Sequence, residues 1–236
     1  MRAVIFANGR LNQGDDIVTA LRPDDLLIAA DGGAHHCLAL GLPPKIVIGD
    51  LDSLAEDDLA RLKGNRATIL QYPRHKDFTD LELALRYALE QRVSEILILG
   101  ALGDRWDQTI ANLLLPAILL SMPQASPPEP HSGVRISIVD GEQEIFFLRS
   151  GEKLAIRGQP GDTVSLIPLA GNAHGVTTHN LEYPLDGADL HFGSTLGVSN
   201  VLLTESGSVS MSEGLMLCIV IHESSRGGRY PPEGVE

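Results

Sequence analysis

Two aspartates, Asp50 and Asp52, follow a short apolar run in the stretch VIGDLDS at positions 47–53. If the run is a strand, side chains alternate between its faces, so both carboxylates would point the same way at its end. Two like charges at this spacing repel each other unless a positive charge lies between them. A polar turn needs only one acid, whereas a pair of acids favours a divalent metal ion.

Acidic residues follow several of the predicted strands in the first half: Asp31, Asp50, Asp52, Asp77, Asp80 and Asp107. In an open parallel sheet the loops after the strands share one edge, where ligands bind. The acids would repel one another strongly there without cations. A magnesium–phosphate ligand resolves the conflict, because the metal takes the carboxylates and the phosphates take Mg²⁺, Lys76, Arg105 and backbone N–H groups.

These residues also have structural interpretations, which remain open at this point. Thr79 with Glu82 matches a capping box, so Thr79 could serve only to begin a helix. Asp77 and Asp80 could be charges that complement the dipole at the start of that helix. Asp31 before two glycines is also a common turn pattern, and the glycines would let the backbone approach an anion.

Other conspicuous residues receive structural interpretations. His35 and His36 have no partner at metal-binding spacing and are interpreted as a surface pair at a helix start. Trp106 opens a predicted helix and is interpreted as packed. Cys37 and Cys218 lie far apart and form neither a zinc motif nor a disulfide framework, which fits a reducing cytoplasm.

The chain has 236 residues, of which 43% are hydrophobic, so it is long enough for a substantial core. Its formal charge of −13 argues against broad binding to nucleic acids or anionic membranes. No run reaches the roughly 18 apolar residues of a membrane helix. The apolar run after Met1 is too short for a signal peptide, so we expect a cytoplasmic globular protein.

The elements that position the acids alternate along the first half. Strands are predicted over 3–7, 26–30, 45–49, 67–72, 95–100 and 134–140, and helices over 15–21, 34–41, 56–63, 79–92 and 106–120. Gly41 is the predicted stop signal of the second helix. Strands that are apolar on both faces and separated by helices indicate a parallel sheet covered on both sides.

The pattern changes in the second half. The segment 122–133 holds four prolines and is interpreted as a loop or linker. Short β-like runs separated by turn residues follow, which is typical of an antiparallel β-sandwich. The tail at 224–236 is predicted to be disordered. The predicted fold class is therefore α/β plus all-β, with a C-terminal antiparallel β-sandwich.

Five motifs in a fixed order resemble those of the thiamin pyrophosphokinase family. They are Asn8-Gly9, ADGGA at 30–34, GDLDS at 49–53, KDFTDLELAL at 76–85 and GDRWDQTIAN at 103–112. In the second half VSLIPL, NLEYPL and LGVSN are similar to the family's thiamin-binding domain. One departure is Asn180-Leu181-Glu182, where the family has Gly-Leu before Tyr-Pro. The resemblance covers the chain to about residue 222.

This resemblance implies a Rossmann-like α/β catalytic domain over 1–140 and a thiamin-binding sandwich over 141–223. It implies transfer of the β,γ-diphosphate of ATP to the hydroxyl of thiamin, giving thiamin diphosphate and AMP. It also implies a homodimer whose active sites are shared between the α/β domain of one subunit and the sandwich of the other.

The site residues follow from the same resemblance. Mg²⁺ and the ATP phosphates are expected at Asp50, Asp52, Asp80 and Asp107. Further contacts to ATP are expected from Asp31, Gly32, Gly33, Lys76, Asp77, Thr79, Gly103 and Arg105. Thiamin is expected at Gln108, Ser199 and Asn200.

Three alternatives remain. A pterin pyrophosphokinase of related architecture would use the same acids on a hydroxymethylpterin. A haloacid-dehalogenase-type phosphatase is disfavoured, because its aspartate nucleophile follows the first strand whereas Asp50 follows the third. A non-catalytic sensor of nucleotide or thiamin diphosphate would usually have lost a metal-binding acid, and all four are present here.

Overall fold

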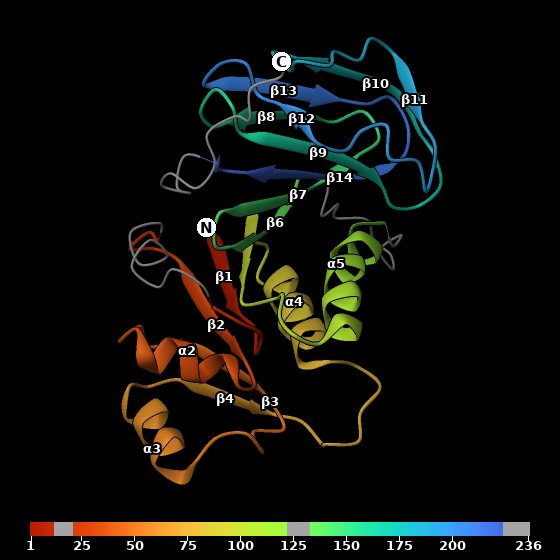
Figure 1. Cartoon of the computed structure of the whole chain (residues 1–236). Helices are drawn as coiled ribbons and strands as arrows, with labels where there is room; N and C mark the ends of the chain where they lie inside the picture. Colours follow the sequence, from red (N-terminus) through yellow and green to blue (C-terminus); the bar gives the residue numbers. More distant parts are fainter. Residues whose placement is uncertain (12–20, 122–132, 224–236) are drawn as a thin grey trace. The chain divides into compact units, whose positions relative to one another are not determined.

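The computed structural model describes residues 1–11, 21–121 and 133–223 (Figure 1). The chain divides into two compact units, Met1–Gly141 and Glu142–Glu236. Almost all of the predicted helix over 15–21, most of the proline-rich segment 122–133 and the tail at 224–236 lie outside the described residues. In the described part of the chain, no helix combines the length and the apolar character that crossing a membrane requires.

The N-terminal unit is built on a parallel sheet whose strands are arranged in the order β6-β5-β1-β2-β3-β4. The strands are β1 (Arg2–Phe6), β2 (Leu26–Ala30), β3 (Ile46–Gly49), β4 (Thr68–Gln71), β5 (Glu95–Leu99) and β6 (Arg135–Asp140). All lie within the ranges predicted from apolar runs except for Arg2 at the start of β1. The parallel sheet is therefore confirmed.

Helices cover both faces of this sheet, α2 and α3 on one side and α4 and α5 on the other (Figure 1). They are α2 (Gly33–Ala39), α3 (Glu56–Gly64), α4 (Asp80–Glu90) and α5 (Trp106–Ser121). Val4, Phe6 and Val47 form one buried cluster with residues of α2 and α3. α4 packs against β1, β2 and β3, where intervening residues such as Ile5 and Ile28 are fully buried. Strands buried on both faces explain the unbroken apolar runs.

The strand order places β1 in the middle, with β2 on one side and β5 on the other. The chain runs outward from β1 through β2, β3 and β4, and then returns to the opposite side of β1 with β5. The loops after β1 and β5 therefore lead in opposite directions, and such a switch point leaves a crevice at the carboxyl ends of the strands. The expected position of a ligand is next to these two loops.

The C-terminal unit consists of two antiparallel sheets that enclose one core. One sheet has the order β7-β14-β9-β12, with β7 (Gln143–Arg149), β14 (Leu215–Ile221), β9 (Thr163–Pro168) and β12 (Asn200–Val201). The other has the order β11-β10-β13-β8, with β11 (Ala188–Leu190), β10 (Ala173–His179), β13 (Ser206–Ser210) and β8 (Lys153–Arg157). Val164 and Val220 from the first sheet share a buried cluster with Val176 and Val209 from the second. The predicted sandwich is confirmed.

A buried carboxylate joins two segments of the C-terminal unit, the loop over 159–162 and the residues that follow β14. Asp162 is 1% exposed and accepts hydrogen bonds from the backbone N–H of Gln159 at 2.8 Å and of Glu223 at 3.0 Å. Nδ1 of His222 donates to it at 2.9 Å. Burial alone would raise the pKa of this carboxyl, but the hydrogen bonds outweigh burial and hold the pKa of Asp162 below its ordinary value of 3.8.

We expect Asp162→Asn to lower the free energy of unfolding at pH 7 by about 1–3 kcal/mol, because the amide cannot accept all these hydrogen bonds. A lowered folded-state pKa stabilises the protein fully above the unfolded-state pKa, and this contribution disappears as pH falls through the folded-state value. The difference in melting temperature between wild type and variant should therefore shrink below about pH 4. Asp186→Asn, at an exposed acid of the same unit, is the matched control. A difference that is constant from pH 7 to pH 3 would contradict the assignment.

Candidate active site

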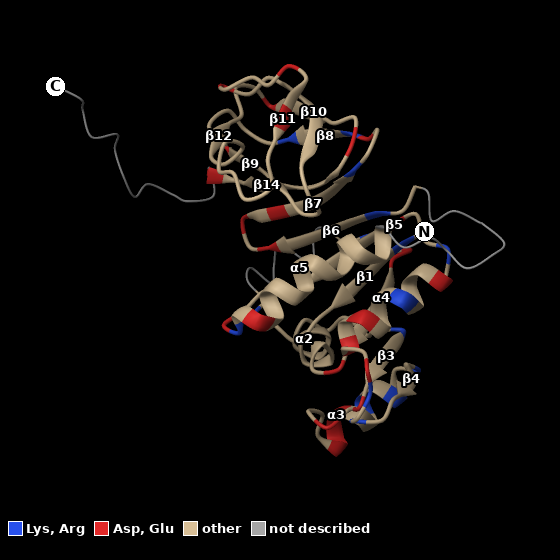
Figure 2. Cartoon of the chain, turned by 90° about the vertical axis from the view of Figure 1, so that its right-hand side faces the viewer, with Lys and Arg blue, Asp and Glu red and all other residues tan. Residues whose placement is uncertain are grey.

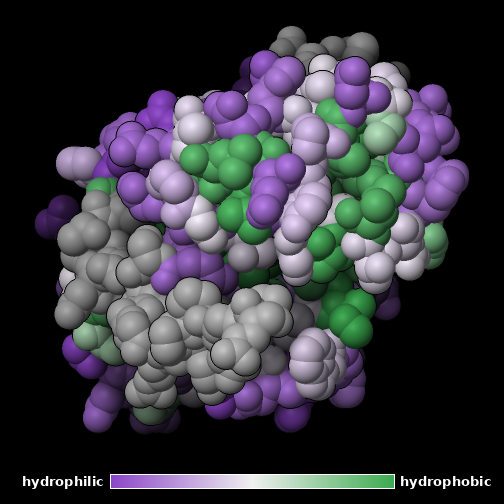
Figure 3. Space-filling model, turned by 45° about the horizontal axis from the view of Figure 1, so that its top comes forward, coloured by the Kyte–Doolittle hydropathy of each residue, from purple (hydrophilic) through white to green (hydrophobic). Residues whose placement is uncertain are grey.

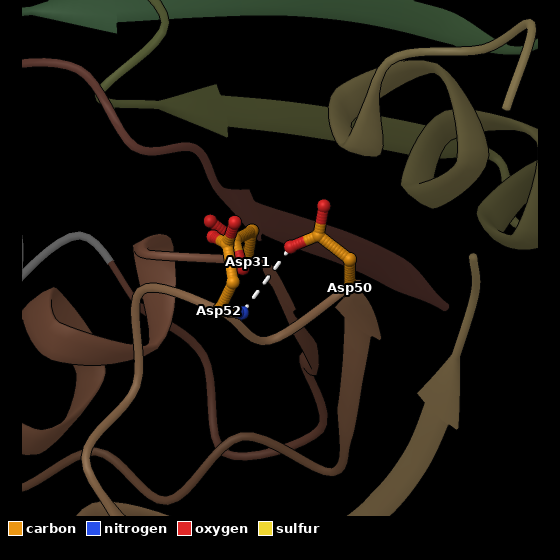
Figure 4. A group of neighbouring side chains, drawn as sticks. All are labelled: Asp31, Asp50 and Asp52. Carbon is orange, nitrogen blue, oxygen red and sulfur yellow. Dashed lines mark hydrogen bonds between the residues drawn. The ribbon is translucent and has the colours of Figure 1, made fainter. Parts of the chain in front are cut away.

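Three aspartates from two strand-end loops come together at the edge predicted for ligand binding. Asp31 follows β2, and Asp50 and Asp52 follow β3 (Figure 4). One carboxylate oxygen from each lies within 4.8 Å of those of the other two. The sequence placed Asp50 and Asp52 in the metal site and Asp31 among the ATP contacts. The structure groups all three.

The reason given for the closeness of Asp50 and Asp52 was wrong. The strand β3 ends at Gly49, so the alternation of side chains along a strand does not apply to them. Instead Leu51 adopts a left-handed conformation with φ of 65°, and the N–H of Asp52 donates to Oδ1 of Asp50 at 3.2 Å. The buried side chain of Leu51 is part of the core formed with α2 and α3, which holds the turn in this conformation.

Among the described residues, only one of the two carboxylate oxygens of Asp31 has a hydrogen-bond donor. Its Oδ2 accepts a hydrogen bond from the hydroxyl of Ser53 at 2.9 Å. Its Oδ1 is buried and accepts no hydrogen bond from any described residue. A buried carboxylate oxygen without a donor is costly unless a cation binds it. Carboxylate oxygens are the ligands that Mg²⁺ and similar hard cations prefer, so the three aspartates fit a divalent metal ion.

Basic and acidic positions, coloured blue and red, both occur along the chain near α3 and β4 (Figure 2). Two basic side chains from the loop before α4 lie close to the acids. Nζ of Lys76 lies 2.9 Å from Oδ1 of Asp80 and 3.8 Å from Oδ2 of Asp50. Nε of Arg74 lies 3.5 Å from Oδ2 of Asp52. Lys76 therefore joins Asp80 to the group formed by the other acids.

Asp80 and Asp107, both predicted to bind metal, differ in their surroundings. Desolvation raises the pKa of Asp80, and the negative charges of Asp31 and Asp50 raise it further, against the lowering effect of Lys76. Asp107 is exposed and bonded to Arg105, with 3.2 Å between Nε and Oδ1. That hydrogen bond lowers the pKa of Asp107. Asp80 is thus the more basic of the two carboxylates.

A pocket of about 620 Å³ opens at the switch point between β1 and β5. The predicted site residues that line it are Asp31, Thr79, Asp80, Gly103, Arg105 and Gln108. Gly32, Gly33, Asp50, Asp52, Lys76, Asp77 and Asp107 are not part of its lining. Thr79 accepts a hydrogen bond from the N–H of Glu82 at 3.2 Å, which confirms that it caps α4. Asp77 is exposed.

Gly32 and Gly33 have a packing role at the start of α2. A Cβ on Gly33 would lie 1.9 Å from the backbone oxygen of Phe6, and one on Gly32 would lie 2.2 Å from Oδ1 of Asn8. Only glycine allows α2 to approach the end of β1 this closely. The two glycines therefore bring Asp31 against the loop that follows β1.

Several residues that line the pocket were missing from the predicted site, and the polar or charged ones among them are Asn8, Arg10, Asp104, Thr109 and Asn112. Nδ2 of the buried Asn112 donates to the carbonyl of Ala101 at 2.6 Å and so holds the loop after β5. Arg10 forms an ion pair with Asp104 at 2.9 Å. Asn8 and Asn112 both lie inside motifs quoted from the sequence, which was the available signal.

In the C-terminal unit the two residues predicted to bind thiamin occupy different environments. Ser199 is exposed and has a φ of 61°. Asn200 is buried, and its side chain accepts from the N–H of Tyr183 at 3.0 Å and donates to the carbonyl of Tyr183 at 2.7 Å. Tyr183 itself is 64% exposed. Asn200 therefore fixes the backbone from which an exposed aromatic ring projects.

Hydrophobic side chains reach the surface of this unit among hydrophilic ones (Figure 3). The large exposed ones are Tyr183, Phe192, Leu196, Val198 and Leu203. In the N-terminal unit Trp106 is 77% exposed, so its interpretation as a packed residue was wrong for the single chain. It belongs to an exposed apolar stripe on α5 with Ile110, Leu114 and Ile118, spaced four residues apart.

Comparison with known proteins follows the same division of the chain. The family model for the thiamin pyrophosphokinase catalytic domain matches residues 19–122, and that for the vitamin B1 binding domain matches residues 153–216. The thiamine pyrophosphokinase of Bacillus subtilis (strain 168) is 29% identical over 215 residues, covering 91% of this chain and 96% of that protein.

The solved structures that resemble this chain include members of the same family. The crystal structure of thiamine pyrophosphokinase from Bacillus subtilis has a TM-score of 0.82 at 27% identity and covers 94% of this chain and 100% of that one. The thiamin pyrophosphokinase structure from Geobacillus thermodenitrificans has a TM-score of 0.78 at 27% identity, covering 95% of this chain and 99% of that one. With both domain models matched in order, the chain belongs to the thiamin pyrophosphokinase family.

Proposed function

We propose that the acidic edge and the pocket of the N-terminal unit bind Mg²⁺ and ATP for the reaction of this family. The activity of the chain is ATP-dependent synthesis of thiamin diphosphate. The observation that carries the site assignment is the grouping of Asp31, Asp50 and Asp52, together with the buried Oδ1 of Asp31, which has no donor among the described residues. Bound there, Mg²⁺ would neutralise negative charge on the phosphates of ATP.

The chain's own groups account for the rest of the phosphate chemistry. Lys76 and Arg105 supply positive charge beside the acids and at the pocket, where phosphate oxygens would accept hydrogen bonds from them. Asn112 holds the loop after β5 in place through the carbonyl of Ala101. Positioning and charge neutralisation are the main requirements of such a transfer, and no covalent intermediate is needed.

The transfer joins the hydroxyl oxygen of thiamin to the β-phosphorus of ATP and breaks the bond between that phosphorus and the oxygen bridging to the α-phosphate. AMP leaves with that oxygen, and the hydroxyl proton passes to a base. We assign Asp80 as the base, because it lines the pocket and its pKa is raised by desolvation. Asp107 is the weaker candidate, since Arg105 lowers its pKa.

In the proposed homodimer described below, thiamin would bind against Gln108 of one subunit and against Ser199 and Asn200 of the other subunit. Because Asn200 fixes the backbone of Tyr183, we propose that the exposed ring of Tyr183 stacks on the planar rings of thiamin. Thiamin is cationic, which suits a chain with a net charge of −13. We place the enzyme in the cytoplasm, where the buried thiols of Cys37 and Cys218 would stay reduced.

The molecule that accepts the diphosphate distinguishes the proposed function from its alternatives. The purified protein is incubated with ATP and Mg²⁺ and with either thiamin, a hydroxymethylpterin or no acceptor, and AMP, inorganic phosphate and bound thiamin are measured. We expect AMP only with thiamin. AMP with the pterin alone would indicate the pterin enzyme, phosphate release without any acceptor would indicate a hydrolase, and thiamin binding without turnover would indicate a sensor.

We further propose a homodimer in which residues of the partner subunit complete each active site. The exposed apolar stripe of Trp106, Ile110, Leu114 and Ile118 supports association, because soluble monomers rarely expose contiguous apolar surface of this kind.

Subunit mixing tests the shared site. Chains carrying Asp52→Asn and chains carrying Asn200→Ala are each expected to be nearly inactive. Co-expressed, they should recover about a quarter of wild-type activity, because half of the dimers are mixed and each mixed dimer regains one intact site. Melting temperatures of both variants control for folding. No recovery from folded mixed dimers would show that each site lies within one chain.

A further inference from the structure

Two adjacent histidines on α2 bond to the backbone carbonyls of two different site loops. Nε2 of His36 lies 2.9 Å from the oxygen of Gly9, in the loop after β1. Nε2 of His35 lies 3.1 Å from the oxygen of Ser53, in the loop after β3. A carbonyl oxygen only accepts, so Nε2 carries the proton in both rings and donates it. The pair therefore does more than cover the surface at a helix start.

Ser53 is held at two atoms. His35 donates to its carbonyl, while its own hydroxyl donates to Oδ2 of Asp31 at 2.9 Å. Ser53 also directly follows Asp52 in the chain. It therefore links Asp31 to Asp52, two of the three carboxylates that lie within 4.8 Å of one another. On the other side of the His35 ring, Oδ2 of Asp58 lies 3.6 Å from Nδ1.

We propose that His35 is a positioning residue that sets the spacing of Asp31, Asp50 and Asp52 for a divalent cation. The inference rests on the proposed function, in which this cluster binds the metal. Three carboxylates within 4.8 Å repel one another, and the turn between Asp50 and Asp52 depends on a left-handed Leu51. Without the bond from His35 to Ser53, the loop can relax and the ligands can spread.

The test measures affinity for Mn²⁺ alone, without nucleotide, by titration calorimetry. His35→Ala should weaken Mn²⁺ binding by about 10–100-fold, the usual cost of losing a group that orients a metal ligand. His35→Gln, which keeps an N–H donor, should restore most of the affinity. His36→Ala is the matched control, because it removes the same kind of bond from the same helix but on the loop after β1. Its Mn²⁺ affinity should stay at the wild-type value.

The outcomes are distinguishable. Wild-type affinity in a folded His35→Ala, or equal weakening in His35→Ala and His36→Ala, would overturn the role of His35. A wild-type protein that binds no Mn²⁺ would overturn the metal site itself. If His35→Ala does not fold, His35→Asn serves instead, because the shorter asparagine side chain should not reach the carbonyl of Ser53. The His35→Asn protein should then bind Mn²⁺ less tightly than the His35→Gln protein.

Discussion

Asp52→Asn should lower kcat by about 10³-fold, because losing a metal ligand removes several kcal/mol of charge stabilisation and each 1.4 kcal/mol is tenfold. Asparagine has the shape of aspartate but carries no charge. The side chain of Asp52 is half-exposed, and its ion-pair partner Arg74 is exposed as well. The fold should therefore survive, and the metal-free protein should be at least as stable, because one repelling charge is gone.

Two measurements on this variant separate a metal role from a structural one. In the wild type Mn²⁺ or Mg²⁺ should raise the melting temperature, and in Asp52→Asn this rise should be largely lost. Asp57→Asn is the control, since Asp57 is an exposed acid in the first turn of α3 outside the cluster. Near-normal turnover of Asp52→Asn, or an undiminished thermal shift, would remove Asp52 from the metal site.

Lys76→Met should lower kcat/KM for ATP by about 10²–10³-fold, because it removes a preorganised charge beside the transferred phosphates. Lys76 is 13% exposed and lies between Asp80 and Asp50. Burial alone would lower the pKa of Lys76, but Asp80, Asp50 and Asp31 together raise it above its ordinary value. The ammonium group therefore stays charged at any pH at which the enzyme works.

The effect should appear in the kinetics of ATP and not in those of thiamin. KM for ATP should rise and kcat should fall, while KM for thiamin should stay close to the wild-type value. Lys63→Met, at an exposed lysine in the last turn of α3, controls for loss of one positive charge. An unchanged kcat/KM for ATP in a folded Lys76→Met would show that Lys76 only balances the charge of Asp80.

The edge on which the acids gather could be predicted from the sequence. Runs such as those before Asp31 and Asp50 are apolar on both faces, which only a covered parallel sheet allows, and the carboxyl ends of its strands share one edge. Turn signals were equally direct: Gly41 follows α2 with a φ of 67°, as expected of a stop signal. Thr79 likewise caps α4 as its spacing to Glu82 predicted.

Details of the site depend on loop conformations that no periodicity specifies. The left-handed conformation of Leu51 brings Asp50 and Asp52 together. Alternation along a strand also predicted that the two side chains lie close, but it was not the cause. The hydrogen bond from His35 to Ser53 joins residues that are 18 positions apart in the chain, and no sequence spacing predicts it. The exposure of Trp106 could not be predicted either, because an aromatic residue on a helix is usually buried.

The most direct test of the account follows the β-phosphorus of ATP. Purified protein is incubated with thiamin, Mg²⁺ and ATP labelled at the β-phosphate, and the nucleotides and thiamin species are separated by chromatography. We predict that the label appears in thiamin diphosphate and that unlabelled AMP forms in equal amount. Label in ADP, with either thiamin monophosphate or unlabelled inorganic phosphate as the other product, or label in pyrophosphate formed without thiamin, would contradict diphosphoryl transfer at this site.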